Sequence, residues 1–240
     1  VRSEHFENEM VRLRFEKEAR AVARVDHPGV VSVFDCGELE DGSQYIVMEL
    51  LHGSDLGSLV RRFGAGTPRQ VARLLIQAGA AIAAAHRAGI VHRDIKPDNI
   101  FLVSGPEGAE QKFSVKILDF GVAKEVDTKT SLTQTGMLVG TPLFMSPEQL
   151  MGQPVDFRSD IYSFAAVGFL ALVGRRVTQE EELINVLLDV CHNDPPKVSS
   201  LISGASAEVD KAFDWALSKE PIDRPACAET WIQSFERALV

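Results

Sequence analysis

Two neighbouring segments constrain the fold more than any other feature of the sequence: VHRDIKPDNIFLV at 91–103 and KILDFGVAK at 116–124. Each segment joins a short apolar, β-branched run to a loop that carries acids or amides. A Gly/Pro-containing turn lies between the two runs. The sequence therefore predicts two short strands, 100–103 and 115–118, with polar loops at their ends.

The side chains in these loops suit a polyphosphate and its metal. Asp94, Asn99 and Asp119 offer carboxylate and amide oxygens, and Lys96 offers a cation. Magnesium prefers oxygen ligands and completes its shell with waters and substrate phosphates. Taken singly, each residue has an ordinary alternative in turn chemistry or backbone capping. Their joint spacing at strand ends, where catalytic side chains usually lie, favours a catalytic site.

Helical periodicity dominates the rest of the chain. Thr67 and Gln70 form the capping box of a helix that ends near Gly89. The run Phe164–Val173 is wholly apolar but well short of the ~18 residues that span a bilayer, so it predicts a helix buried on all sides. Further patterns predict helices over 159–173, 180–191, 207–218 and 228–239.

The first fifty residues predict a helix and a hairpin. Apolar residues at helical spacing indicate a helix over 12–25, which His27-Pro28-Gly29 would stop. Two β-branched runs, 30–34 and 45–50, flank a turn at Glu40-Asp41-Gly42. The expected architecture is α+β, with a small front that contains strands and a larger helical back.

Composition excludes several functions. The 34 Asp+Glu residues outnumber the 25 Lys+Arg residues, for a net charge of −9, and no block of basic residues occurs. We therefore expect no nucleic-acid partner and no contact of this segment with a membrane. Cys36, Cys191 and Cys227 are scattered without C-x-x-C spacing, which indicates neither a zinc site nor a disulfide framework. The cytoplasm is the expected location.

Ordered motifs over nearly the whole chain resemble those of the eukaryotic-type serine/threonine protein kinases, and the phrasing is most similar to bacterial members. HRDIKPDN resembles the catalytic loop, Asp119-Phe120-Gly121 the metal-binding motif, and Ser146-Pro147-Glu148 the end of the activation segment. The resemblance implies a two-lobe kinase domain over 1–240. A partial N-lobe with the regulatory helix and hinge would cover 1–51, and a mainly helical C-lobe 52–240.

The family's catalytic roles carry over by position. Asp94 would orient the substrate hydroxyl and accept its proton, and Lys96 would neutralise the transferred phosphate. Asn99 and Asp119 would hold Mg²⁺. A lysine two residues after the catalytic acid is the family's mark for Ser/Thr substrates. ATP and magnesium are the implied cofactors, and proteins with Ser/Thr acceptors the implied partners.

The resemblance also implies a nucleotide site around YIVMELL. Met48 would be the gatekeeper, and Glu49 and Leu51 would offer backbone groups to the adenine. Asp55 would lie near the ribose, and Phe101 would form the floor of the adenine pocket.

Three further residues have structural roles in the family. Asp160, in DFRSDIYSF, would hold the backbone of the catalytic loop, and Arg224, in KEPIDRP, would pair with Glu148 in the interior. The segment GRRV at 174–177 departs from the usual Gly-x-Pro-Pro-Phe pattern, which leaves the helix-docking surface after it in question.

The segments that open related kinases have no counterpart in the sequence. Neither a glycine-rich strand–turn–strand nor the lysine strand that follows it can be placed before Arg12. Glu18 lies on the apolar face of the first predicted helix, where the family pairs it with that lysine. We therefore expect the chain to begin just downstream of the lysine strand, and the 240 residues alone to bind ATP weakly.

The polar loop 119–148 resembles an activation segment. Arg93, beside the catalytic acid, needs an anion, which a phosphothreonine at Thr133 or Thr135 would supply. Trans-phosphorylation of this kind implies self-association. Thr141 resembles the threonine that contacts the catalytic acid and lysine, so it is expected to be a site residue.

Two other functions compete with a signalling kinase that transfers the γ-phosphate of ATP to proteins. A catalytically impaired fragment or pseudokinase would act as a binding module through its helical lobe. A small-molecule phosphotransferase of kinase-like fold would share the acid–asparagine loop, but it would not explain Arg93 or the threonine-rich segment.

Overall fold

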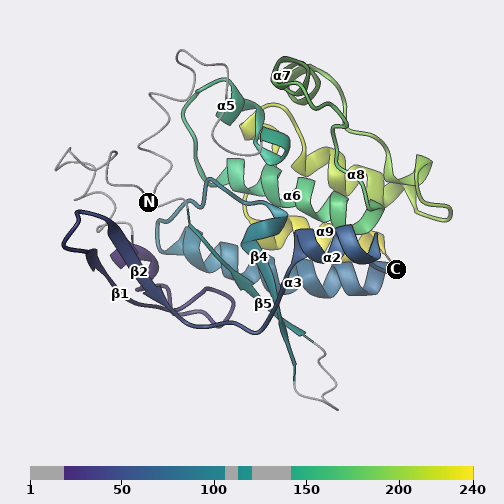
Figure 1. The fold of residues 1–240 in the computed structure, drawn as a ribbon. Helices are drawn as coiled ribbons and strands as arrows, with labels where there is room; N and C mark the ends of the chain where they lie inside the picture. Colours follow the sequence, from purple (N-terminus) through teal and green to yellow (C-terminus); the bar gives the residue numbers. More distant parts are fainter. Residues whose placement is uncertain (1–18, 106–112, 121–141, 240) are drawn as a thin grey trace.

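The computed structural model describes residues 19–105, 113–120 and 142–239. Figure 1 shows a two-stranded hairpin to one side of a body of helices, with a second small sheet lying along that body. This arrangement confirms the predicted α+β class, with few antiparallel strands and a mainly helical remainder. No helix in the described ranges is long and apolar enough to cross a membrane.

The front hairpin consists of β1 (Val33–Glu38) and β2 (Gln44–Met48), which pair antiparallel. Gly42 turns the chain with φ +83°, a conformation that favours glycine. The predicted strand 30–34 is wrong in its boundaries, since β1 starts at Val33. Val30 is buried and forms a parallel bridge with Ile117 instead, so these residues join the front of the molecule to the second sheet.

The first predicted helix is described only from residue 19. Residues 19–22 are helical, and Ala19 and Val22 are buried. The helix ends before Val25, earlier than predicted, and the His27 ring accepts a hydrogen bond from the Gly29 N–H at 3.0 Å just beyond it. Residues 12–18 lie outside the described part of the chain.

The second sheet has the antiparallel order β3–β4–β5, with β3 at Gly53–Asp55, β4 at Ile100–Ser104 and β5 at Phe113–Ile117. The last two strands confirm the predicted pair around the polar loops. The sequence prediction missed β3 and the helix α2 (Leu56–Phe63). The sequence did contain a signal for α2: apolar residues follow helical spacing directly after a capping Asp55, at Leu56, Leu59, Val60 and Phe63.

The remaining predicted helices are confirmed with shifted ends. Thr67 and Gln70 form the expected capping box. The helix predicted from residue 159 begins earlier because Asp156 caps it through the Arg158 N–H at 2.7 Å. These helices are α3 (Pro68–Arg87), α6 (Phe157–Val173), α7 (Leu183–His192), α8 (Ala207–Ala216) and α9 (Ala228–Ala238). The sequence prediction missed the short helix α5 (Pro147–Leu150).

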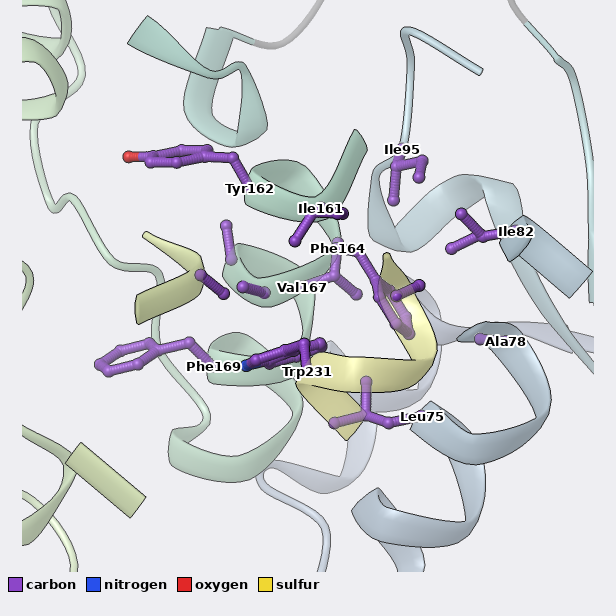
Figure 2. Packing of buried hydrophobic residues seen from close by; sticks show 14 of the residues in the cluster. Leu75, Ala78, Ile82, Ile95, Ile161, Tyr162, Phe164, Val167, Phe169 and Trp231 are labelled. Carbon is purple, nitrogen blue, oxygen red and sulfur yellow. The ribbon is translucent and has the colours of Figure 1, made fainter. Parts of the chain in front are cut away.

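The core is centred on α6, which is buried on nearly every face as predicted. Figure 2 shows its side chains meeting Leu75 of α3 and Trp231 of α9. The Trp231 ring meets Phe164 edge-on with centroids 5.2 Å apart, and its indole N–H donates to the Ala212 carbonyl at 2.9 Å. Because α6 is fixed so firmly, the polar residues in its first turn are held rigidly.

Candidate active site

Three predicted site residues meet in one loop between α3 and β4. The Lys96 ammonium lies 2.9 Å from the Asp94 carboxylate. The amide nitrogen of Asn99 donates to the Asp94 carbonyl at 2.9 Å and to its carboxylate at 3.2 Å. Asn99 is buried, whereas Asp94 and Lys96 are half-buried. The structure therefore places a carboxylate and a cation side by side, and hydrogen bonds from the Asn99 amide hold the carboxylate in position.

Asp160 fixes the backbone of this loop from the first turn of α6, as predicted. Its carboxylate accepts the His92 and Arg93 backbone N–H groups at 2.7 and 2.8 Å, and the His86 ring at 2.7 Å. Arg93 has φ +62°, a left-handed conformation that is costly for a side chain with a Cβ. The buried carboxylate stabilises that strained turn, and the turn carries Asp94.

His92 couples the two polar segments. Its Nε2–H donates to the Leu118 carbonyl at 2.8 Å, and its Nδ1 accepts the Asp94 backbone N–H at 3.3 Å. The ring lies 4.6 Å from that of the buried Phe120. Burial lowers the pKa of His92, and the two hydrogen bonds fit a neutral ring with its proton on Nε2. His92 therefore ties the loop that carries Asp94 to the segment that ends in Asp119.

Asp119 is exposed at the end of that segment, with φ +48°. The preceding residue, Leu118, donates its N–H to the Asn99 carbonyl at 2.9 Å. This hydrogen bond holds the segments that carry the two predicted metal ligands, Asn99 and Asp119, side by side. The amide nitrogen of Asn99 is used by Asp94, so its amide oxygen is the atom available to a metal. A carboxylate and an amide oxygen fit a magnesium ion that keeps waters and phosphate oxygens as further ligands.

Most residues predicted for the nucleotide site lie between the end of β2 and the start of α2, and Phe101 lies on β4. Met48 ends β2 with 40% of its surface exposed. Glu49 and Leu51 are half-buried in the connection that follows. The Asp55 carboxylate accepts the Ser58 N–H at 2.7 Å and so caps α2, while its backbone pairs with Phe101 of β4. Asp55 thus has a structural role whatever it does for a ligand.

Lys116 is a residue that the sequence prediction missed. Its ammonium contacts the Glu49 carboxylate at 2.5 Å and donates to the Val30 carbonyl at 3.2 Å. Burial raises the pKa of Glu49, but hydrogen bonds from Lys116 and Ser32 outweigh it and hold the pKa below its usual value. The only signal was a lysine among the apolar residues at the end of β5. This ion pair fixes the connection after β2 to the strand that leads to Asp119.

We expect Lys116→Met to lower the free energy of unfolding by about 0.5–1.5 kcal/mol, because the half-buried Glu49 loses its cation. Chemical denaturation measures this, and amide exchange at Ser32, whose N–H donates to Glu49 at 2.7 Å, should accelerate. Lys197→Met, which breaks an exposed pair with Asp214, is the control and should change stability by less than 0.5 kcal/mol. Equal effects of the two variants would contradict the assigned role.

The predicted interior ion pair is present. Arg224 contacts both oxygens of Glu148 at 2.6 and 2.7 Å, and both residues are buried. Ser159 donates to the same carboxylate at 2.5 Å, and Arg224 also donates to the Ser218 carbonyl at 2.8 Å. Burial raises the pKa of Glu148, and the hydrogen bonds from Arg224 and Ser159 more than reverse this, so the carboxylate stays charged.

The predicted regulatory residues are only partly described. Arg93 is half-buried, and its carbonyl accepts the Gln149 side-chain amide at 2.8 Å. Gln149 also accepts the Ser146 N–H at 3.1 Å, so it joins α5 to the loop that carries Arg93 and Asp94, a contact that the sequence did not reveal. Glu18, Thr133, Thr135 and Thr141 lie outside the described residues.

A small front sheet, a helical body and a polar loop between them define a kinase-like fold. Two solved structures of the Mycobacterium tuberculosis PknI kinase domain superpose on the chain with a TM-score of 0.75 each. They share 23% and 24% sequence identity with it, and cover 100% and 99% of this chain and 83% of their own. The sequence matches the protein kinase domain family over residues 2–235, and the chain belongs to that family.

Several curated relatives of the chain are bacterial serine/threonine-protein kinases. A probable serine/threonine-protein kinase of Corynebacterium efficiens is 39% identical over 221 residues, which is 89% of this chain and 32% of the relative. Pkn1 of Myxococcus xanthus is 39% identical over 94% of this chain and 32% of its own length. PknB of Mycobacterium tuberculosis is 37% identical over 88% of this chain and 33% of its own length. The chain thus spans about a third of the length of these relatives.

Proposed function

We propose that this chain is the catalytic region of a cytoplasmic serine/threonine protein kinase, with a partial N-lobe at 1–51 and a C-lobe at 52–240. It transfers the γ-phosphate of ATP to Ser/Thr hydroxyls of proteins. The contact of Lys96 with Asp94, supported from below by Asn99, is the observation that carries the proposal. The family match and the names of the relatives support the same substrate class.

Asp94 accepts a hydrogen bond from the acceptor hydroxyl and aims its oxygen at phosphorus. A bond forms between this oxygen and the γ-phosphorus as the bond to the leaving ADP oxygen breaks, and the hydroxyl proton passes to Asp94. Lys96 lies against Asp94 and neutralises negative charge on the transferred group. Magnesium, when bound at Asn99 and Asp119, supplies further charge neutralisation and holds the phosphates.

The residues after β2 provide the nucleotide site in this proposal. Met48 borders the adenine, and backbone groups of Glu49 and Leu51 bind its edge. Phe101 forms the floor, and Asp55 lies near the ribose. The Glu49–Lys116 pair supports the assignment, because it holds this connection in register with the strand that ends at Asp119.

Magnesium-dependent transfer of labelled phosphate from ATP to a basic protein, measured with the full-length protein, tests the function. We expect the transfer to stop when EDTA removes the metal, and Asp119→Asn to abolish it, since an amide is a poorer magnesium ligand. Asp35→Asn, an exposed acid on β1, is the control and should retain activity. If the full-length protein is folded and binds ATP but transfers no phosphate, this result would favour the pseudokinase alternative instead.

Regulation is proposed to act through Arg93, with Thr133 or Thr135 as the phosphorylated partner. The half-buried position of Arg93 beside Asp94 supports this, since a phosphate there would act directly on the catalytic loop. Intact-mass analysis should show added phosphate on the active protein and none on Asp94→Asn. A fully active protein of unmodified mass would rule out this role of the two threonines.

A further inference from the structure

A polar cavity of about 210 Å³ lies between α6, the last turn of α7 and the segment that follows α8. Its apolar lining consists of Val177, Pro195 and Pro196, together with Val190 and the ring of Tyr162. None of the described residues that line it is among those predicted for the active site. Pockets for drug-sized ligands have volumes of about 300–1,000 Å³, so a cavity of this size suits a smaller molecule.

Lys219 places a cation in the wall of this cavity. Its side chain is half-buried, and its ammonium donates to the Val190 carbonyl at 2.7 Å. Within the part of the chain that the structure describes, Lys219 forms no ion pair. Burial lowers the pKa of Lys219, and the charges of Asp189 and Asp194 oppose this effect. Because one ammonium offers three N–H groups, those that Val190 does not use can bind an anionic group.

The hydroxyl of Tyr162 is a second donor at the cavity. Only 2% of the Tyr162 surface is exposed, and Figure 2 shows the hydroxyl pointing away from the hydrophobic core. No group of the described residues forms a hydrogen bond with it. The Arg224 guanidinium lies over the ring, 5.0 Å from its centroid, and holds it in place. A buried hydroxyl without a partner costs free energy, and a ligand that accepts its hydrogen bond removes this cost.

Carboxylates border the same cavity at Glu180, Asp189 and Asp194. Asp189 is half-buried and accepts the Asn193 side-chain amide at 2.9 Å, whereas Glu180 and Asp194 are exposed. The described residues contain no group of three or more acidic, histidine or cysteine side chains that could hold a metal ion. The carboxylates repel a simple anion, and Lys219 repels a simple cation. The charges at the cavity therefore favour a molecule that carries both signs.

We propose that this cavity binds a small apolar α-amino acid as the free zwitterion. The carboxylate of the ligand accepts hydrogen bonds from the Lys219 ammonium and the Tyr162 hydroxyl. Its ammonium lies toward Asp189 and Asp194, and its side chain packs on the apolar lining. Hydrogen bonds from two donors to one carboxylate fix the orientation of the ligand. The proposal is independent of the kinase function.

A ligand in this cavity joins three parts of the helical body. Tyr162 belongs to α6, Asp189 lies in the last turn of α7, and Lys219 follows α8. We therefore expect amide exchange over residues 186–193 to slow when the ligand binds, because local opening of α7 would break its contacts with the ligand. Hydrogen exchange with and without the ligand measures this. Unchanged exchange at saturation would contradict the placement of the ligand against α7.

The binding test is isothermal titration calorimetry of the full-length protein with L-leucine as the probe. We expect saturable binding with a Kd of about 1 mM or lower. Lys219→Met should weaken it about tenfold or more, because the carboxylate of the ligand loses a charged donor. Lys211→Met removes an exposed lysine on α8 and is the charge-matched control, which should bind within about twofold of the parent.

Tyr162→Phe separates a binding role of the hydroxyl from a structural one. The variant keeps the ring and its contact with Arg224, and it removes a hydroxyl that has no partner in the described part of the chain. Its melting temperature, measured by circular dichroism, should therefore change by less than about 2 °C. Binding of L-leucine should weaken about threefold or more. Binding equal to that of the parent would overturn the proposal.

Two analogues of L-leucine that carry one charge each test the zwitterion. The ammonium is absent from 4-methylpentanoate, and the carboxylate is absent from 3-methylbutylamine. Each analogue should bind at least about tenfold more weakly than L-leucine, because it leaves charged groups of one sign at the cavity without a partner. Equal or tighter binding of either analogue would overturn the proposal. So would the absence of any heat of binding with L-leucine up to about 10 mM.

Discussion

Replacing Arg224 with alanine is expected to lower the free energy of unfolding by about 3–5 kcal/mol, because it leaves the buried Glu148 carboxylate without its cation. The pair is bidentate, at 2.6 and 2.7 Å, and excluded from solvent. The substitution also removes donors to the Ser218 and Lys219 carbonyls. Chemical denaturation measures the loss, and Arg87→Ala, which breaks the exposed pair with Glu229, should cost less than about 1 kcal/mol.

A double variant separates the contribution of the ion pair to stability from the cost of leaving Glu148 buried without its cation. Glu148→Gln/Arg224→Met removes both charges, so we expect it to be more stable than Arg224→Ala alone. The contribution of the pair also depends on pH. Because the folded-state pKa of Glu148 lies below its unfolded value, the stabilisation is complete above the unfolded value and is lost as the pH falls through the folded one. A constant stability difference between parent and double variant from pH 7 to pH 3 would contradict this account.

Replacing Asp94 with asparagine in the full-length protein is expected to reduce the rate of phosphate transfer by about 10²–10⁴-fold while the protein stays folded. Asparagine has the same shape and can still contact Lys96 and Asn99, but it cannot accept the hydroxyl proton. Radiolabel transfer from ATP measures the rate, and circular dichroism checks the fold. Asp98→Asn changes an exposed acid in the same loop and is the matched control, with an expected change of less than about threefold. Activity of Asp94→Asn near that of the parent would refute its role.

Local patterns were sufficient to predict the polar loop before β4 and most helices, and the catalytic role of that loop stays a prediction from the resemblance. Strand ends that carry Asp94, Asn99 and Asp119 are visible in the sequence, and the capping box at Thr67 and Gln70 marks a helix start without any tertiary information. The capping signal at Asp55 was equally local, so α2 was predictable although it was missed.

Other features depend on contacts between distant segments and could not be predicted from periodicity. Val30 has the β-branched side chain of a strand residue, but its place beside Ile117 is decided by the second sheet. The Glu49–Lys116 pair joins residues 67 positions apart, and a lysine in a mainly apolar strand does not show which carboxylate it contacts. The local sequence of Arg93 gives no sign of its left-handed backbone, because Asp160 of α6, far away in the chain, stabilises it.

The most direct measurement of the central claim is transfer of phosphate from ATP to three peptides that differ only in their acceptor, serine, threonine or tyrosine, with the parent and Asp94→Asn proteins side by side. The account predicts magnesium-dependent phosphoserine and phosphothreonine with the parent alone. Tyrosine phosphorylation at a comparable rate, or equal products from both proteins, would contradict the assignment of Asp94 and Lys96 to serine/threonine phosphate transfer.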